Sequence, residues 1–159
     1  MGVSNCIDYN TENVLEKVMD YTNNRGVDLI IDPVGGENWK ISYKCLAPMG
    51  KLIVYGDQNF VKGKSFSLYT TLKEVFSMPK YKPMDLMSKN KSIMGYHLGR
   101  LAGEEDKIQR AVTELSQIVQ KNNIRPVIDR VFPFSEAHKA HSYIQDRKNF
   151  GKVLLDFRD

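Results

Sequence analysis

Three short apolar runs, each with a glycine at its end or within the next three residues, constrain the fold of this chain most strongly. They are VDLIID at 27–32, KLIVYG at 51–56 and KSIMGY at 91–96. Nearly continuous β-branched and aliphatic runs of this length predict strands that are covered on both faces. Amphipathic stretches separate the runs, and this alternation predicts repeated strand–helix–strand units. We therefore expect an α/β chain with a doubly wound, mainly parallel sheet.

The rest of the sequence predicts further elements around these runs. The clearest is a helix at 104–121, where apolar residues recur every three or four positions and acidic residues occupy the first turn. The others, in chain order, are a strand at 6–9, a helix capped by Thr11 and ended by Gly26, a helix through Trp39, Tyr43 and Leu46 stopped by Pro48 and Gly50, a helix including Leu68, Leu72, Val75 and Phe76, a strand at 127–132, a helix from Ser135 to about Arg147, and a strand at 151–157.

Composition excludes several classes of protein. The hydrophobic content of 42% argues against a disordered chain, and two cysteines in 159 residues argue against a disulfide scaffold. No apolar run approaches the roughly 18 residues that span a bilayer. The first ten residues lack the basic and apolar stretches of a secretory signal. We therefore expect a cytoplasmic protein whose two cysteines are reduced.

The positive charge is concentrated in one segment, residues 60–92. This segment contains seven lysines, one glutamate and one aspartate, so its net charge is +5, whereas the whole chain has a net charge of +4. Such a segment could bind nucleic acid or an anionic membrane surface. No arginine lies among the lysines, and we do not expect a nucleic-acid binder. A solvated surface is the simpler interpretation, and an interaction or membrane-traffic module is the alternative.

Glycine-containing segments follow the three apolar runs, at 32–36, 56–59 and 95–99. Ligands of open parallel sheets bind outside the carboxyl ends of the strands, and glycine allows a close backbone approach. These segments predict a nucleotide site, with tight strand-to-helix turns as the alternative. The chain has neither a G-x-G-x-x-G nor a G-x-x-x-x-G-K-[ST] phosphate motif.

The histidines do not predict a metal site. His138 and His141 are three residues apart on a predicted helix, but no cysteine or third histidine lies near them in the sequence. His97 follows a predicted strand and could contact a ligand there. The chain has no G-x-S-x-G nucleophile motif. A Ser/His/Asp triad therefore stays open, without a feature that favours it.

Longer segments resemble one known family in order and spacing. They are IDY at 7–9, GVDLIIDPVGG at 26–36, LAPMGKLIVYG at 46–56, GYHLGRLAGE at 95–104, RPVIDRVFPFSEAHKAH at 125–141 and KNFGKVLL at 148–155. The chain resembles the zinc-independent quinone oxidoreductases of the medium-chain dehydrogenase/reductase superfamily, and within them the vesicle amine transport protein homologues. The resemblance implies NADP(H), no catalytic zinc, and hydride transfer to a small-molecule quinone or enone.

The resemblance also implies where this chain lies within the family's fold. Residues 1–124 match the C-terminal part of a dinucleotide-binding domain, and residues 125–159 match a segment that returns to the catalytic domain. The expected fold is thus a partial Rossmann-like sheet without its first two strands. In the order 3-2-1-4-5-6 this leaves the strand at 6–9 without its neighbours and makes 27–32 an edge. The strand at 6–9 could then lie beside 27–32, stay unpaired, or be completed by another chain.

Cofactor contacts follow from the resemblance position by position. Tyr9 resembles the tyrosine beside the adenosine, and Pro33, Val34 and Gly35 match the turn near the adenine-side ribose. Tyr55, Gly56, Asp57 and Gln58 match the segment under the nicotinamide half, and Tyr96, His97 and Leu98 match the stretch whose backbone holds the carboxamide. Arg147, Asn149 and Lys152 match the basic residue near the cofactor and its neighbours. The family's pyrophosphate-binding glycines have no counterpart, so we expect weak NADPH binding and no activity of this chain alone. The resemblance also implies a homodimer through 91–96, because that segment matches the edge strand by which the family dimerises.

Overall fold

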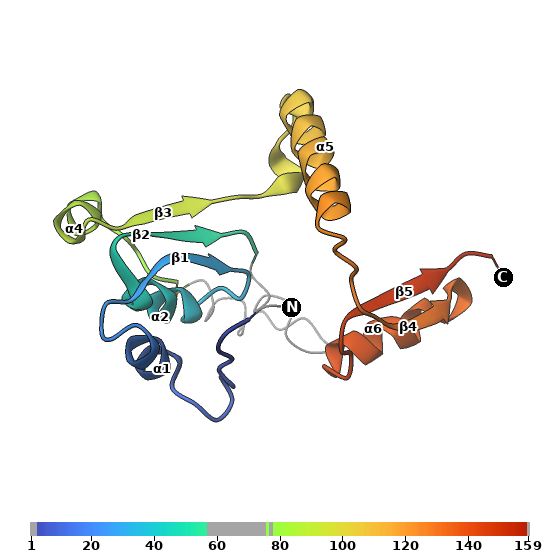
Figure 1. Cartoon of the computed structure of the whole chain (residues 1–159), viewed down its shortest axis with the longest axis horizontal. Coiled ribbons are helices and arrows are strands. Elements are labelled where there is room, and N and C mark those ends of the chain that lie inside the picture. Colours follow the sequence, from blue (N-terminus) through green and yellow to red (C-terminus); the bar gives the residue numbers. More distant parts are fainter. Residues whose placement is uncertain (1–2, 57–75, 77, 159) are drawn as a thin grey trace. The chain divides into compact units, whose positions relative to one another are not determined.

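The computed structural model describes residues 3–56, 76 and 78–158. The chain forms two compact units, Met1–Arg100 and Leu101–Asp159. Each unit has a parallel sheet of its own, with three strands in the first and two in the second (Figure 1). The predicted α/β class with parallel pairing is therefore confirmed. The predicted division after residue 124 follows family relationship rather than compactness, and it stays a prediction.

The three apolar runs form the sheet of the first unit. Its strands are β1 (Val27–Asp32), β2 (Leu46–Val54) and β3 (Ser92–Gly95), in the order β1-β2-β3 with every pair parallel. One row across the sheet joins Ile30, Leu52 and Ile93. β1 lies at an edge, as the sequence predicts.

Helices α1 (Val14–Tyr21), α2 (Asn38–Cys45) and α4 (Pro83–Lys89) belong to the same unit. The N-cap of α1 is Asn13 and not the predicted Thr11. The Asn13 side-chain oxygen accepts hydrogen bonds from the backbone N–H groups of Leu15 and Glu16, at 3.1 and 3.3 Å. Asparagine in extended conformation satisfies two orphan donors there, which explains the later start of the helix.

The predicted strand at 6–9 is wrong. Residues 5–8 have no regular structure, and a turn begins at Tyr9. The carbonyl of Asp8 accepts hydrogen bonds from the N–H groups of Thr11 and Glu12, at 3.0 and 2.8 Å. A strand needs a neighbour for its backbone groups, and this segment pairs with none among the described residues. Of the three alternatives for this strand, the structure shows the unpaired one.

The boundary between α2 and β2 also differs from the prediction. The helix ends at Cys45 and β2 begins at once with Leu46, so Pro48 and Gly50 lie inside the strand rather than at a helix stop. Met49 adopts a left-handed φ of 67° and donates its N–H to the carbonyl of Asn90 at 2.6 Å. This hydrogen bond ties the first part of β2 to the C-cap of α4, just before β3. The helix predicted through Leu68, Leu72 and Val75 lies outside the described residues.

The core of the first unit lies on one face of its sheet. Tyr43, Leu46 and Leu52 are buried, and the half-buried side chains packed against them are Ile30, Val54, Tyr81, Leu86 and Ile93. The opposite face carries Leu29 and Ile31, whose exposed fractions are 51% and 58%, together with the exposed Met94. Within the described part of the first unit, α2 and the Tyr81–Leu86 segment cover one face of β1, and the cover expected on its other face is not seen there.

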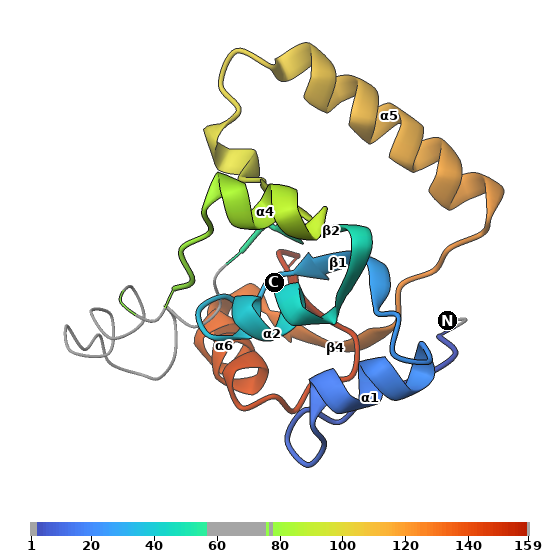
Figure 2. The same cartoon turned by 90° about the vertical axis from the view of Figure 1, so that its left-hand side faces the viewer.

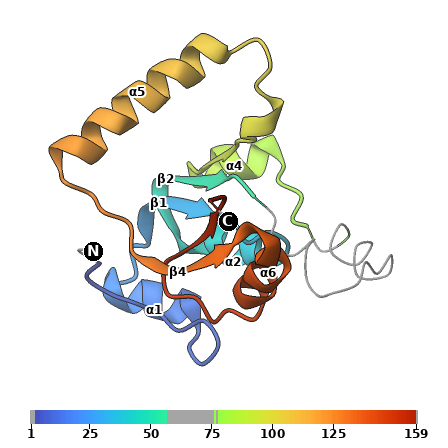
Figure 3. The ribbon, with the colours of Figure 1, turned by 90° about the vertical axis from the view of Figure 1, so that its right-hand side faces the viewer.

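The second unit contains α5 (Glu105–Lys121), β4 (Ile128–Pro133), α6 (Ala137–Gln145) and β5 (Lys152–Asp156). β4 and β5 pair in parallel, and α6 lies against them (Figure 3). Phe132 and Ala140 are buried, and the Phe132 and Tyr143 ring centroids are 5.9 Å apart. The predicted cap Ser135 instead lies within the 3₁₀ turn Phe134–Glu136. Among the described helices, none has the length and apolar character to cross a bilayer.

Candidate functional site

The carboxyl ends of the three strands of the first unit are held in line by backbone hydrogen bonds. The Tyr55 N–H donates to the Asp32 carbonyl at 3.3 Å, and the Tyr96 N–H donates to the Val54 carbonyl at 2.9 Å. The segments that follow β1, β2 and β3 therefore begin side by side. This is the edge at which open parallel sheets bind their ligands.

Asp32 fixes the turn after β1. Its side chain is 3% exposed, and its carboxylate accepts hydrogen bonds from the Val34 N–H at 2.8 Å, the Asn38 side-chain amide at 2.8 Å and the Ser42 hydroxyl at 2.6 Å. A buried carboxylate needs such partners to offset its lost hydration. The three bonds hold the turn against the first two turns of α2.

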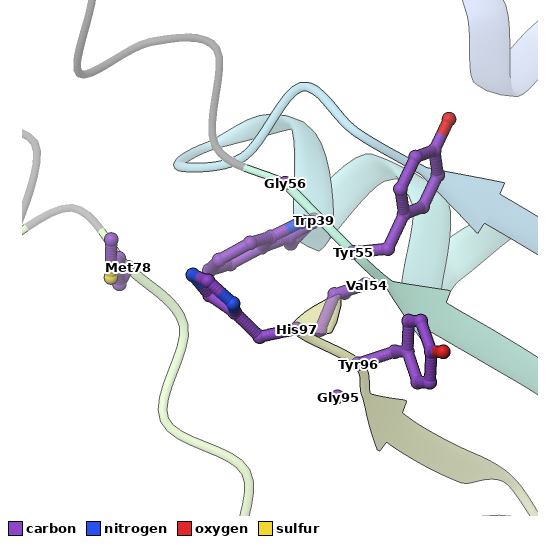
Figure 4. A pocket seen from close by; sticks show the side chains of 8 residues that line it. All are labelled: Trp39, Val54, Tyr55, Gly56, Met78, Gly95, Tyr96 and His97. Carbon is purple, nitrogen blue, oxygen red and sulfur yellow. The ribbon is translucent and has the colours of Figure 1, made fainter. Parts of the chain in front are cut away.

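A pocket of about 620 Å³ opens at these strand ends, within the 300–1,000 Å³ range of small-molecule sites. Figure 4 shows the Trp39 and His97 rings at the centre of the view, with Met78 on one side and the Tyr55 and Tyr96 rings on the side of the strands. The lining residues are Trp39, Val54, Tyr55, Gly56, Met78, Gly95, Tyr96 and His97. Four aromatic side chains in one pocket suit a planar, partly apolar ligand.

Gly56 allows the turns after β1 and β2 to approach each other. A Cβ atom at this position would lie 3.2 Å from the Pro33 carbonyl oxygen, which is tighter than an ordinary contact. A larger residue would push the Pro33 turn away from the pocket wall. The glycine at this strand end thus has a packing reason, in addition to leaving backbone open toward a ligand.

Tyr81 holds the helix that carries Trp39. Its hydroxyl donates to the Trp39 carbonyl at 3.0 Å, and its ring centroid lies 4.9 Å from that of Tyr43. Burial raises the pKa of Tyr81 to about 12, so the hydroxyl stays a donor at neutral pH. The residues before α4 thereby position one wall of the pocket.

Sequence reasoning missed Trp39 and Met78 as pocket residues. Trp39 is the single tryptophan of the chain, and its helical spacing suggested only a core position. Its indole nitrogen Nε1 is buried and has no hydrogen-bond acceptor in the part of the chain that the structure describes. A buried donor without an acceptor is uncommon, and none of the described residues supplies an acceptor here. A tryptophan three residues after a Gly-Gly turn was the available signal.

Part of the predicted cofactor set meets at the pocket. Tyr55, Gly56, Tyr96 and His97 line it, and the turn of Pro33, Val34 and Gly35 begins beside it. Leu98 starts the next 3₁₀ turn and does not line the pocket. Tyr9 is an exposed turn residue, and Asp57 and Gln58 lie outside the described residues.

Three predicted cofactor residues belong to the second unit. Arg147 follows α6 in a left-handed conformation with φ 55°. The Asn149 side-chain amide donates to the Gly151 carbonyl at 3.0 Å, and Lys152 begins β5 with its N–H bonded to the Val127 carbonyl at 2.8 Å. Their assignment to the cofactor stays a prediction, as does that of the residues at the pocket.

The described residues do not assemble a metal site. No group of three or more His, Cys, Asp and Glu side chains within them could hold a metal ion. His138 and His141 lie exposed on α6. A dehydrogenase zinc would require three or four such ligands converging on one point.

Comparison with known proteins places this geometry in a family. The family model described as zinc-binding dehydrogenase matches residues 1–155. The synaptic vesicle membrane protein VAT-1 homolog of Rattus norvegicus is 34% identical over 154 residues, which are 97% of this chain and 38% of that protein. The chain thus spans about two-fifths of the length of this relative.

Two solved structures share the fold. The human synaptic vesicle membrane protein VAT-1 homolog-like protein superposes with a TM-score of 0.70 at 24% identity, over 99% of this chain and 40% of that one. Escherichia coli quinone oxidoreductase complexed with NADPH gives 0.68 at 20% identity, over 94% and 42%. With a family model that covers nearly all of its length, the chain belongs to the zinc-binding dehydrogenase family, and the vesicle VAT-1 homologues are among its relatives.

Proposed function

We propose that the pocket at the strand ends receives the nicotinamide half of NADP(H), within an oxidoreductase that exchanges a hydride with a quinone or enone. The observation that carries this proposal is the meeting of Tyr55, Gly56, Tyr96 and His97 around one pocket. These residues come from two strand ends 41 positions apart in the sequence. Their shared place is the edge where doubly wound sheets bind dinucleotides.

The residues present fit a nicotinamide. Trp39 offers the buried Nε1–H donor that lacks an acceptor among the described residues, and a carboxamide oxygen is a suitable acceptor. The aromatic rings provide flat apolar surface for a planar ring. When bound, the nicotinamide supplies the hydride, and this chain's residues orient it and exclude water. The E. coli quinone oxidoreductase complexed with NADPH supports the choice of cofactor.

We further propose that the affinity of this chain for NADPH is weak. The sequence contains no glycine-rich loop followed by a helix that could hold the pyrophosphate. The nicotinamide end alone contributes only part of the binding free energy of a dinucleotide. Hydride transfer also needs a substrate held beside a firmly bound nicotinamide ring. We therefore expect no reductase activity from this chain alone.

The proposed assembly is a homodimer through the free edge of β3. The Tyr96 N–H points to β2, and the alternation along a strand directs the Ile93 and Gly95 backbone groups to the other side. That side pairs with no strand among the described residues. An edge of this kind can pair with a second copy across a two-fold axis.

NMR titration tests the pocket and the affinity separately. We expect millimolar NADPH to shift the backbone amide signals of Tyr55, Gly56, Tyr96 and His97, without saturation in the micromolar range. Trp39 fluorescence should be quenched over the same concentrations, because the chain has no other tryptophan. Saturation at about micromolar NADPH, equivalent to about −8 kcal/mol, would contradict weak binding. Shifts confined to other residues would contradict the site.

A pair of variants controls this titration. Trp39→Phe keeps an aromatic ring in the pocket but removes the Nε1–H donor, so the amide shifts should weaken. Tyr21→Phe is the matched control, because Tyr21 is an exposed aromatic residue at the end of α1 and does not line the pocket. Equal titrations of both variants would remove Trp39 from the proposal while leaving the pocket itself in place.

A further inference from the structure

The two ends of β3 differ in chemistry. At its carboxyl end, Gly95, Tyr96 and His97 line the pocket. Before its amino end, Lys89 lies exposed in the last turn of α4, and Lys91 is half-buried. Figure 1 shows α4 at the beginning of β3, and Figure 2, seen from that end of the sheet, shows α4 in front of the strands. Within one copy, the strand therefore separates these lysines from the pocket.

The two lysines are held differently within their own copy. The Lys91 ammonium donates a hydrogen bond to the Tyr43 carbonyl at 3.1 Å, in the last turn of α2. The Lys89 ammonium lies 5.8 Å from the centroid of the Tyr43 ring, and no carboxylate among the described residues forms an ion pair with it. Lys91 thus stabilises a helix end, whereas the charge of Lys89 is available to an anionic group.

The proposed pairing of two copies through β3 would bring the two chemistries together. A two-fold axis perpendicular to the sheet makes the paired strands antiparallel, so the amino end of one β3 lies beside the carboxyl end of the other. The same axis keeps the covered faces of both sheets on one side. The pocket is on that face, because Trp39 of α2 lines it, and α4 packs there through Leu86.

The outward backbone groups of β3 allow two registers of this pairing. The axis lies beside Ile93 in one register and beside Met94 in the other. Counted along the antiparallel strands, His97 lies across from the partner's Lys89 in the first register and from the partner's Lys91 in the second. In the second register the partner's Lys89 is two residues further along, about 7 Å, which an extended lysine side chain largely spans. Both registers therefore bring the partner's Lys89 to the rim of the pocket.

We propose, on the basis of the dimer and the cofactor proposed above, that the partner's Lys89 completes the pocket by binding a phosphate group of NADP(H) beside His97. The described lining residues include neither lysine nor arginine. An ammonium group forms charge-assisted hydrogen bonds with phosphate oxygens. Each copy then supplies the aromatic walls of its own pocket and the cation of the other. Cofactor binding and dimerisation consequently strengthen each other.

Mixed dimers test whether the lysine acts across the interface. The Lys89→Glu variant is isotopically labelled for NMR, so only the amides of its own pocket are observed during a titration with NADPH. Alone, its affinity should be about five- to tenfold below that of the wild type. An excess of unlabelled wild-type chain places the labelled copies in mixed dimers. We expect this to restore the affinity, because the wild-type partner supplies Lys89.

Three controls accompany the titration. Unlabelled Ile93→Pro, which should dimerise weakly, should restore less affinity than wild type at the same concentration. Lys121→Glu on α5 makes the same change in charge away from β3 and should leave the NADPH affinity unchanged. Free nicotinamide has no phosphate and should shift the pocket amides equally in wild type and Lys89→Glu. Sedimentation velocity and the amide spectrum show that Lys89→Glu is dimeric and folded.

The outcomes separate this inference from the proposals on which it rests. Pocket amides that respond to both ligands in a dimer, with equal NADPH affinities for wild type and Lys89→Glu, overturn the role of Lys89 alone. A loss of affinity in Lys89→Glu that excess wild-type chain does not restore shows a lysine acting within its own copy, and it overturns the shared site. A wild-type monomer, or no response to either ligand, overturns the inference together with the proposed dimer or cofactor.

Discussion

The two faces of the three-stranded sheet carry the same kinds of residue and have opposite environments. On β1, Ile30 packs into the core while its neighbour Ile31 is 58% exposed. On β2, Leu52 is fully buried, and in the row next to it Ile31 pairs with Ile53, which pairs with Met94. Alternation along a strand makes the two faces equally apolar, so the difference lies in what covers them.

The covered face is closed by segments close to the strands in the sequence. α2 connects β1 directly to β2, and Tyr81 and Leu86 precede β3. These connections place their apolar side chains on one face. Parallel sheets are normally covered on both sides. The other face has no cover from the described residues of this unit, and an apolar sheet face of this kind can serve as an association surface.

A cavity at Leu52 is expected to cause the largest decrease in the free energy of unfolding. Leu52→Ala removes a fully buried side chain and should lower the free energy of unfolding by about 3–5 kcal/mol. Leu29→Ala makes the same chemical change on the open face and should cost less than about 1 kcal/mol. The urea midpoints of the two variants measure the difference. Equal losses would show that Leu29 is also covered in solution.

Loss of the Asp32 carboxylate is expected to cause the second-largest decrease in the free energy of unfolding. Asp32→Ala leaves the Val34 N–H, the Asn38 amide and the Ser42 hydroxyl without their acceptor and should cost about 2–4 kcal/mol. Asp32→Asn should recover part of this, because an amide oxygen still accepts. Asp28→Ala is the control on the same strand, and it breaks only an exposed ion pair with Arg25. Similar losses at Asp28 and Asp32 would contradict the structural role of the Asp32 network.

Disruption of the proposed dimer is expected to have the smallest effect on free energy of the three. Ile93→Pro removes an N–H from the free edge of β3 rather than from its pairing with β2. Two-fold symmetry doubles the loss to about 2 kcal/mol, which raises the dimer dissociation constant roughly 30-fold. Ile93→Ala keeps the N–H and serves as the control. A wild-type monomer at tens of micromolar in sedimentation velocity, or a folded Ile93→Pro protein that dimerises as tightly as Ile93→Ala, would exclude this edge.

The sequence predictions that succeeded rest on local patterns, and the one that failed depended on a distant neighbour. The three apolar runs and the long amphipathic helix lie where the structure has β1, β2, β3 and α5, within a few residues. Their periodicity is a local property. The strand predicted at 6–9 failed because a strand exists only with a neighbour, and the apolar letters of a sequence do not reveal whether one is present.

The candidate site likewise has a part that the sequence predicted and a part that it did not. The glycine-containing segments after the strands were predicted to share one edge of the sheet, because the carboxyl ends of parallel strands lie together, and the family resemblance added Tyr55, Gly56, Tyr96 and His97 as contacts there. Trp39 and Met78 come from other segments and join the pocket only through the packing of α2 and the residues before α4. No spacing rule connects them to the strand ends.

The sequence by itself determined the parallel α/β class, the identity of the strands and the row of glycines at their ends, because pattern and backbone freedom are written residue by residue. Tertiary structure alone decided which face of the sheet became the core, and that the Trp39 Nε1–H has no acceptor among the described residues. Those outcomes depend on segments distant in the sequence that meet in space, and burial, unlike periodicity, is a property of the neighbours.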